Sequence, residues 1–146
     1  ECALADKAGN TSFVFVNEAP GYSGLKERVY DFEVTKTVIS VDVRRLDDVL
    51  SGQKVGFIKI DCEGAEFLVM RGALNILKTH RPIVSFESGD ASLLNYDYVA
   101  GAIYDFWVEL NYSITSLDGR KHSREEFVSA NAAQQYWDYV AWPQTY

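Results

Sequence analysis

The sequence of 146 residues lacks several features that mark particular classes of protein. It has 14 Lys and Arg against 21 Asp and Glu, a net charge of −7, which argues against binding to nucleic-acid phosphates. No apolar run reaches the roughly 18 residues of a membrane helix, and no signal-peptide pattern opens the chain. We therefore expect no nucleic-acid partner, no membrane partner and a cytoplasmic location.

Cysteine and histidine are equally scarce. The two cysteines, Cys2 and Cys62, are expected to be reduced, small residues of the core. His80 lies at the end of a helical pattern and His122 in a basic turn, so we expect both to be solvated. No Ser-His-Asp arrangement, C-x-x-C pair, H-E-x-x-H motif or phosphate-binding glycine loop is present, so the common hydrolase, zinc and nucleotide signatures are missing.

The composition is that of an ordinary globular protein, with 47% hydrophobic and 24% charged residues. The length fits one domain, residues 1–146, that is large enough to bury a core. Strand and helix patterns alternate, which favours a single α/β domain. We expect strands at 2–5, 11–16, 37–43, 55–60, 83–86, 112–117 and 139–142, and helices at 46–50, 65–80 and 96–110 and from Ser123.

The clearest unit runs from residue 55 to residue 87. The apolar run 55–60 is typical of a parallel strand that is buried on both faces. From Ala65 the apolar positions form one stripe of a helix that ends near His80, before Arg81-Pro82. The strand at 83–86 follows, so this segment predicts a βαβ unit.

Acidic residues stand where both strands of this unit end. Asp61, Glu63 and Glu66 follow the first strand, and Glu87 closes the second. Ligands of open α/β sheets bind beyond the carboxyl ends of the strands, so we expect catalytic roles for the first three and a substrate-binding role for Glu87. Two structural alternatives stay open: Asp61 as a helix N-cap, and Glu63 and Glu66 as acids favoured by the helix dipole.

Four neighbouring acids would repel one another unless a cation, a basic partner or a raised pKa relieves them. A divalent ion with oxygen ligands would do so, although the spacing alone establishes no metal site. A divalent-cation-dependent hydrolase that uses Asp61, Glu63, Glu66 and Glu87 is therefore one alternative function.

The same residues carry a family resemblance. The run FIKIDCEGAEFLVMRGA, followed by RPIVSFE, resembles the FkbM-type family of S-adenosylmethionine-dependent methyltransferases, which show IKIDVEGAE, a helix with L.GA, and P.I..E. The segments CALADKAGNTSF, YSGL, VDVRRLDDVL and YWDYVAWP are similar to further parts of the family pattern, in the same order. The resemblance covers nearly the whole chain.

The resemblance implies part of a Rossmann-like α/β methyltransferase fold, with a mostly parallel sheet, helices on both faces and a C-terminal antiparallel strand. It implies S-adenosylmethionine as the cofactor. It also implies O-methylation of a small-molecule acceptor, a hydroxyl of a sugar or natural product, with rate enhancement mainly from proximity and alignment. By position, it places Asp61 and Glu63 near the methyl-transfer site, where Asp61 orients or deprotonates the acceptor hydroxyl or helps to hold the cofactor. It places Asp6 near the adenine of the cofactor.

The chain also departs from the family pattern. The glycine-rich D.GAN.G turn that wraps the cofactor's methionine part, and the strand that ends in a ribose-binding acid, have no counterpart here. The chain thus resembles the C-terminal two-thirds of a class I methyltransferase domain. A truncated, non-catalytic binding or assembly module is therefore the main alternative to an enzyme.

The missing strand would be the neighbour of 55–60, and its absence leaves an apolar edge that proteins rarely expose. Three explanations of this edge stay open. An N-terminal half that would cover it has been removed, the strand at 37–43 or 11–16 moves into the gap, or a second chain pairs across it. We expect a homodimer, or pairing with another chain, through the edge of strand 55–60.

Overall fold

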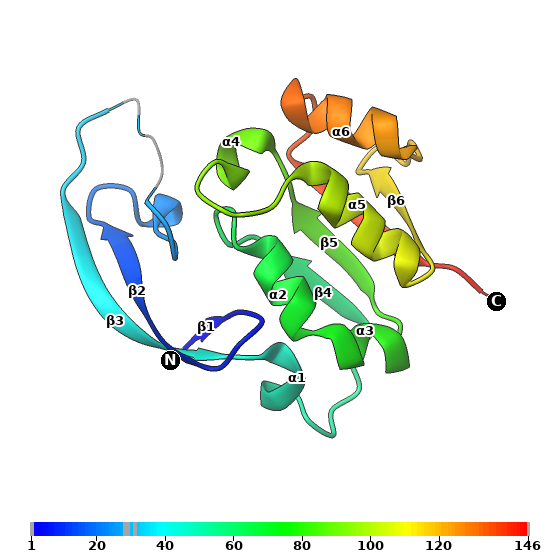
Figure 1. Cartoon of the computed structure of the whole chain (residues 1–146), viewed down its shortest axis with the longest axis horizontal. Helices are drawn as coiled ribbons and strands as arrows, with labels where there is room; N and C mark the ends of the chain where they lie inside the picture. Colours follow the sequence, from blue (N-terminus) through cyan, green and yellow to red (C-terminus); the bar gives the residue numbers. More distant parts are fainter. Residues whose placement is uncertain (1, 28–29, 31, 146) are drawn as a thin grey trace.

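The computed structural model describes residues 2–27, 30 and 32–145, which form two mixed β-sheets with helices packed beside them (Figure 1). The smaller sheet has the strand order β1-β3-β2 and the larger has the order β4-β5-β7-β6. The α/β class is confirmed. The expectation of one mostly parallel sheet is wrong, because only β1–β3 and β4–β5 are parallel among the named strand pairs.

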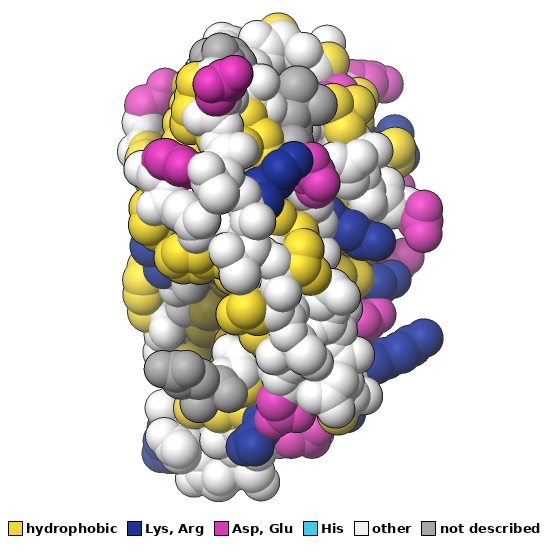
Figure 2. All heavy atoms as spheres, turned by 90° about the vertical axis from the view of Figure 1, so that its left-hand side faces the viewer, with side chains coloured by type: hydrophobic (Ala, Val, Ile, Leu, Met, Phe, Trp, Pro, Cys, Tyr) yellow, Lys and Arg dark blue, Asp and Glu magenta, His cyan; other side chains and the backbone are white. Residues whose placement is uncertain are grey.

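The smaller sheet is built around a long hairpin. Strands β2 (Gly9–Val16) and β3 (Lys36–Arg44) pair antiparallel along their whole lengths, and the short β1 (Ala3–Leu4) lies parallel to the end of β3. The connection includes the 3₁₀ helix η1 (Pro20–Tyr22), and residues 28, 29 and 31 of the expected loop lie outside the described part. Figure 2 shows the side of the molecule on which this hairpin lies.

The larger sheet contains the expected βαβ unit. Strand β4 (Phe57–Ile60) lies parallel to β5 (Ile83–Glu87), and the connection carries α2 (Glu66–Gly72) and α3 (Leu74–Thr79). The predicted single helix 65–80 is thus broken at Ala73, whose φ of −107° and ψ of 11° are not helical. The other elements are α1 (Leu46–Val49), α4 (Asp90–Leu93), α5 (Ala100–Glu109), β6 (Tyr112–Ser116), α6 (Arg124–Ala132) and β7 (Asp138–Pro143).

One face of the larger sheet forms the core. Helices α2, α3 and α5 lie in front of this sheet (Figure 1), and they pack against alternate strand residues such as Val84, Phe86 and Tyr139, which are fully buried. On the opposite face Phe57 is 60% exposed and Trp142 is 41% exposed. Alternate side chains of each strand point to opposite faces, and helices cover only one face of the larger sheet. For the described residues, the expectations of helices on both faces and of a strand 55–60 buried on both faces are therefore wrong.

Strand β4 lies at the edge of its sheet. Within the described part of the chain it pairs with β5 on one side, and no strand lies on the other. A shift of β2 or β3 into this gap was one of the three alternatives, and the structure instead pairs these strands with each other in the smaller sheet. Pairing of this edge with a second chain therefore stays a prediction.

Two further expectations concern burial and membranes. Both cysteines have free thiols, but Cys2 is exposed and Cys62 is half-buried, so the core position expected for Cys2 is wrong. Cys2 precedes the two-residue β1, which is too short to cover it. Among the described residues, no helix has the length and apolar character needed to cross a membrane.

Candidate functional site

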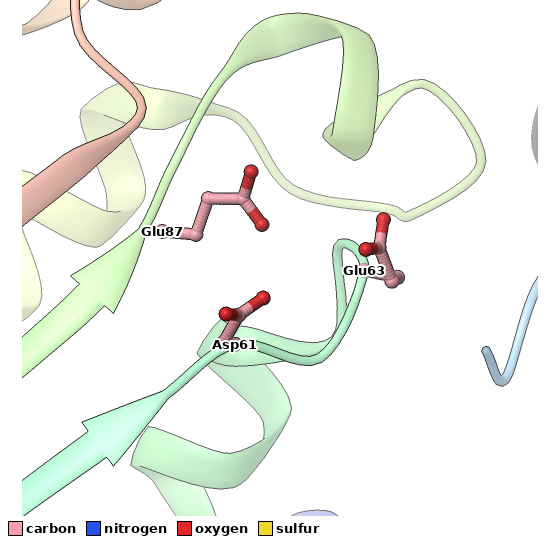
Figure 3. A group of neighbouring side chains, drawn as sticks. All are labelled: Asp61, Glu63 and Glu87. Atoms are coloured by element: carbon pink, nitrogen blue, oxygen red, sulfur yellow. The ribbon is translucent and has the colours of Figure 1, made fainter. Parts of the chain in front are cut away.

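Three carboxylates meet where β4 and β5 end (Figure 3). Asp61 directly follows β4, Glu87 is the last residue of β5, and Glu63 comes from the loop after Asp61. One carboxylate oxygen from each lies within 4.8 Å of the others. The parallel pairing of β4 with β5 brings their carboxyl ends together, so the expected convergence of these three acids is observed.

Left-handed backbone shapes the loop that presents Glu63. Glu63 has a φ of 55°, and Gly64 follows with a φ of 98°. A Cβ atom at Gly64 would lie 2.2 Å from the carbonyl oxygen of Ser92, so only glycine fits there. The carbonyl of Gly64 accepts a hydrogen bond from the Tyr98 hydroxyl, whose pKa is raised by burial. These contacts fix the position of Glu63 above the sheet.

Glu66 lies beneath this loop and is outside the group of three acids. Its side chain is buried, and one carboxylate oxygen accepts hydrogen bonds from the backbone N–H groups of Cys62 (2.7 Å) and Gly64 (3.2 Å). Burial raises its pKa, and these two N–H donors oppose the shift. The geometry makes Glu66 a support for the loop, and a catalytic role for it remains only a prediction.

Lys59 gives the acids a cationic neighbour. Its Nζ lies 2.5 Å from Oδ2 of Asp61, and this hydrogen bond raises the pKa of Lys59. Two unit charges 4.8 Å apart repel by about 1 kcal/mol in water. Asp61 retains 48% of its side-chain exposure, so water screens this repulsion and Lys59 offsets part of it. The cluster can therefore exist without a metal ion, although its oxygen atoms suit a hard divalent cation.

The neighbouring thiol of Cys62 is chemically quiet. Burial raises the pKa of Cys62 to about 11, and the charge of Glu66 adds to the shift. A thiol with this pKa stays protonated near neutral pH, where only the thiolate is a strong nucleophile. The site therefore offers carboxylates rather than a cysteine for chemistry.

Asp6 is not part of this cluster. Its carboxylate forms an ion pair of 2.8 Å with Arg71, near the C-terminal end of α2, whereas the acid loop lies at the N-terminal end. A helix of seven residues is about 10 Å long, so the structure does not bring Asp6 and Asp61 together. The backbones approach closely here, because a Cβ atom at Gly72 would lie 2.2 Å from the carbonyl oxygen of Ala5.

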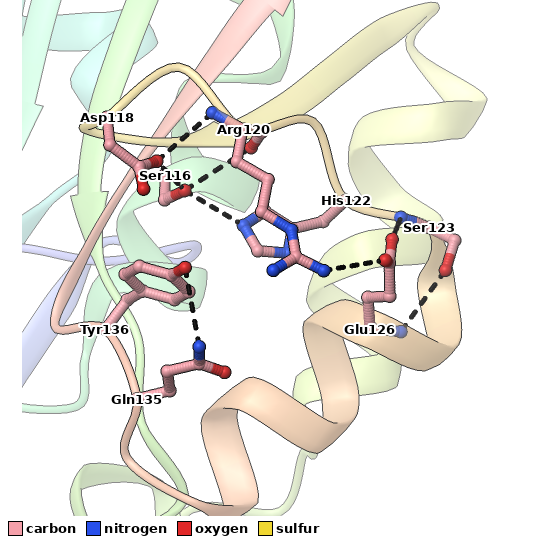
Figure 4. A network of polar contacts seen from close by, with 8 residues as sticks. All are labelled: Ser116, Asp118, Arg120, His122, Ser123, Glu126, Gln135 and Tyr136. Carbon is pink, nitrogen blue, oxygen red and sulfur yellow. Dashed lines mark hydrogen bonds and ion pairs between the residues drawn. The ribbon is translucent and has the colours of Figure 1, made fainter.

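A second polar network, around His122, was not expected from the sequence (Figure 4). His122 is buried, so the expectation that it is solvated is wrong. The turn after β6 folds its ring against Tyr136 and Tyr139, and Nε2 lies 3.1 Å from the hydroxyl of Ser116. The solvated surface of His80, by contrast, is confirmed.

The hydrogen bonds indicate which tautomer of His122 is present. Ser116 donates to Asp118 at 2.5 Å, so its oxygen is left to accept from the Nε2–H of His122. Nδ1 then carries a lone pair, and it is buried with no hydrogen-bond partner in the described part of the chain. Burial lowers the pKa of His122, and Arg120 lowers it further. The one signal in the sequence is Ser116, a polar residue that alternates with the apolar Tyr112 and Ile114 along β6, but this pattern does not indicate which residues it contacts.

Comparison with known proteins identifies the family to which the chain belongs. The sequence model of the methyltransferase FkbM domain matches residues 2–114. The chain belongs to the FkbM methyltransferase family. The matched region includes both strands of the βαβ unit and all four acids of the two strand ends, so the candidate site lies inside the family domain. Searches of curated proteins and of solved structures gave no match.

Family membership implies S-adenosylmethionine, so the fit of these residues to that cofactor matters. The sequence has no glycine-rich turn after a strand that could wrap the methionine part. Asp6, expected near the adenine, is paired with Arg71 and lies at the opposite end of α2 from Asp61. The described residues therefore do not form a complete site for this cofactor.

Proposed function

We propose that this chain carries the acceptor side of an S-adenosylmethionine-dependent O-methyltransferase, which acts on a hydroxyl of a sugar or natural product. The observation that supports the proposal is the meeting of Asp61, Glu63 and Glu87 at the carboxyl ends of two parallel strands, inside the family domain. In open α/β sheets this edge is where ligands bind.

Asp61 is the residue best placed to handle the acceptor hydroxyl. It is half-exposed, its carboxylate faces the space shared with Glu87 (Figure 3), and Lys59 balances its charge. We assign Asp61 the task of accepting the hydrogen bond from the hydroxyl and then its proton as the oxygen becomes a nucleophile. Glu87 and Glu63 would hold neighbouring hydroxyls of the same acceptor, because carboxylates accept such bonds well.

Binding of hydroxylic compounds tests this assignment. Saturation-transfer NMR with a panel of monosaccharides and hydroxylated phenols should identify a binder, and Asp61→Asn should weaken its binding about tenfold, equivalent to about 1.4 kcal/mol. Asp48→Asn, an exposed acid of α1, is the matched control and should bind normally. A panel without any binder, or an equal loss in the control, would contradict the proposal.

Cofactor binding is a separate question. Because the sequence lacks the glycine-rich turn and Asp6 is paired with Arg71, we expect calorimetric titration of this chain with S-adenosylmethionine or S-adenosylhomocysteine to give no measurable binding. Methyl transfer would then require cofactor-binding residues beyond these 146 positions, and by itself the chain would act as a binding module. Tight binding of either compound would overturn this part of the proposal.

A cation-dependent hydrolase is the second candidate, favoured by the three clustered carboxylates. Thermal unfolding with Mg²⁺, Mn²⁺ or Ca²⁺ tests it, since a ligand at 100 times its dissociation constant stabilises the folded state by about 2.7 kcal/mol. A rise in Tm that Asp61→Asn abolishes would support this candidate. Equal melting curves with and without each ion would exclude it.

A further inference from the structure

A cavity adjoins the acid loop but does not contain the acid cluster. It has a volume of about 820 Å³, is partly open to solvent, and is lined by the β1–β2 turn, the start of β2, helix α2 and the segment between α4 and α5. Ligand sites usually occupy about 300–1,000 Å³, so this cavity is large enough for a small metabolite. Asp61, Glu63 and Glu87 are not among its lining residues.

The charge of its wall is opposite to that of the whole chain. Lys7, Lys26 and Arg71 line the cavity, and among the described residues of its wall Asp97 is the one acid. The complete sequence, by contrast, has an excess of seven acidic groups. Within the described residues neither Lys7 nor Lys26 forms an ion pair, so no carboxylate of this part of the chain neutralises either ammonium group.

The rest of the wall suits a hydroxylated ring. Tyr96 and Tyr98 lie side by side, with ring centroids 5.3 Å apart, and both line the cavity. Small polar side chains complete it, namely Asn10, Thr11, Ser12 and Asn95. Aromatic faces pack against the apolar face of a sugar ring, while amides and hydroxyls exchange hydrogen bonds with its hydroxyl groups.

The cavity and the acid loop share structural elements. Tyr98 donates its hydroxyl hydrogen bond to the carbonyl of Gly64 in the acid loop. Gly24 precedes the cavity residue Leu25 and lies against the side chain of Glu63. A Cβ atom built at Gly24 would be 3.4 Å from the Cβ atom of Glu63. A ligand held in the cavity therefore lies beside the loop that presents the acids.

We propose that this cavity binds a phosphorylated sugar, with Lys7 and Lys26 holding the phosphate and the tyrosine pair packing on the ring. The inference rests on the proposed function, because it names the chemical class of the methyl acceptor. Arg71 contributes less, since Asp6 already neutralises it. The two lysines supply the charge that distinguishes a sugar phosphate from a neutral sugar.

Titration calorimetry with glucose 6-phosphate, ribose 5-phosphate, glucose and inorganic phosphate tests the cavity. At least one sugar phosphate should bind at least tenfold more tightly than glucose and than phosphate, and its binding should weaken as salt is raised. The double variant Lys7→Ala/Lys26→Ala should lose at least tenfold in affinity. The matched control is Lys54→Ala/Lys121→Ala, which removes two exposed lysines outside the cavity and should bind like the wild type.

Three results would overturn the inference: no sugar phosphate binds, glucose or phosphate binds equally well, or the control variant loses as much affinity as the cavity variant. The Asp61→Asn variant separates this inference from the proposed function. If lysine-dependent sugar-phosphate binding persists while Asp61→Asn leaves the binding of hydroxylic compounds unchanged, the cavity assignment stands and the proposed function fails.

Discussion

Replacing Glu66 with alanine removes the acceptor for two backbone N–H groups of the acid loop. The N–H groups of Cys62 and Gly64 donate to the same carboxylate oxygen of Glu66, at 2.7 and 3.2 Å. A buried donor left without a partner costs about 1–3 kcal/mol. Loss of the packed methylenes adds about 1 kcal/mol, and relief of carboxylate burial offsets part of the sum.

We therefore expect Glu66→Ala to lower the free energy of unfolding by about 2–4 kcal/mol, a large part of the 5–15 kcal/mol typical of a domain. Glu66→Gln keeps a side-chain oxygen as acceptor and should cost about 1 kcal/mol. Urea unfolding followed by tryptophan fluorescence measures both values, because unfolding exposes Trp107, which is fully buried in the core.

Glu109→Ala is the matched control, since Glu109 is an exposed acid at the end of α5 and should change stability by less than about 0.5 kcal/mol. The assignment of Glu66 as the support of the loop fails if Glu66→Ala costs less than about 1 kcal/mol. It also fails if Glu66→Gln costs as much as Glu66→Ala, because the shared acceptor would then be irrelevant.

Three further predictions concern other parts of the molecule. The pKa of His122 is lowered in the folded state, so as the pH falls below about 6.5 the unfolded chain takes up a proton before the folded chain does. Acidification should therefore destabilise the wild type relative to His122→Gln by up to about 1.4 kcal/mol per pH unit. Parallel pH profiles of urea unfolding for the two proteins would contradict this. Gly72→Ala should cost about 1–3 kcal/mol, because the new Cβ meets the Ala5 carbonyl, whereas Gly21→Ala enters open space and should be nearly neutral in thermal unfolding. Sedimentation should show dimers that Phe57→Lys shifts to monomers, and a wild type that is monomeric at the highest attainable concentration would refute pairing through β4.

Much of the local structure could be predicted because short-range patterns encode it. The alternation at 37–43 gives β3, and Ser123 with Glu126 forms the capping box that starts α6. The convergence of Asp61 with Glu87 also followed from the sequence, since a strand, a helix and a second strand place both carboxyl ends at one edge.

The remaining features depend on contacts between distant segments, which no local pattern encodes. The sequence of β2 and β3 indicates strands but not that they form a separate sheet, since pairing depends on which edges meet. In the sequence, Glu66 and Glu63 are both acids that follow strand β4, and nothing local distinguishes them. Only the left-handed turn of the backbone at Gly64 places Glu66 beneath the loop. His122 is buried because Tyr136 and Tyr139 return across β6 from the end of the chain.

The left-handed conformation of Glu63 has a consequence for protein engineering. A non-glycine residue with a φ of 55° costs about 1 kcal/mol, and glycine would remove most of that cost. A screen that rewards heat resistance alone would thus favour Glu63→Gly and discard a carboxylate of the site. Libraries of this chain selected jointly for melting temperature and ligand binding should retain the acid, so the amino acid that survives at this position reports which property was under selection.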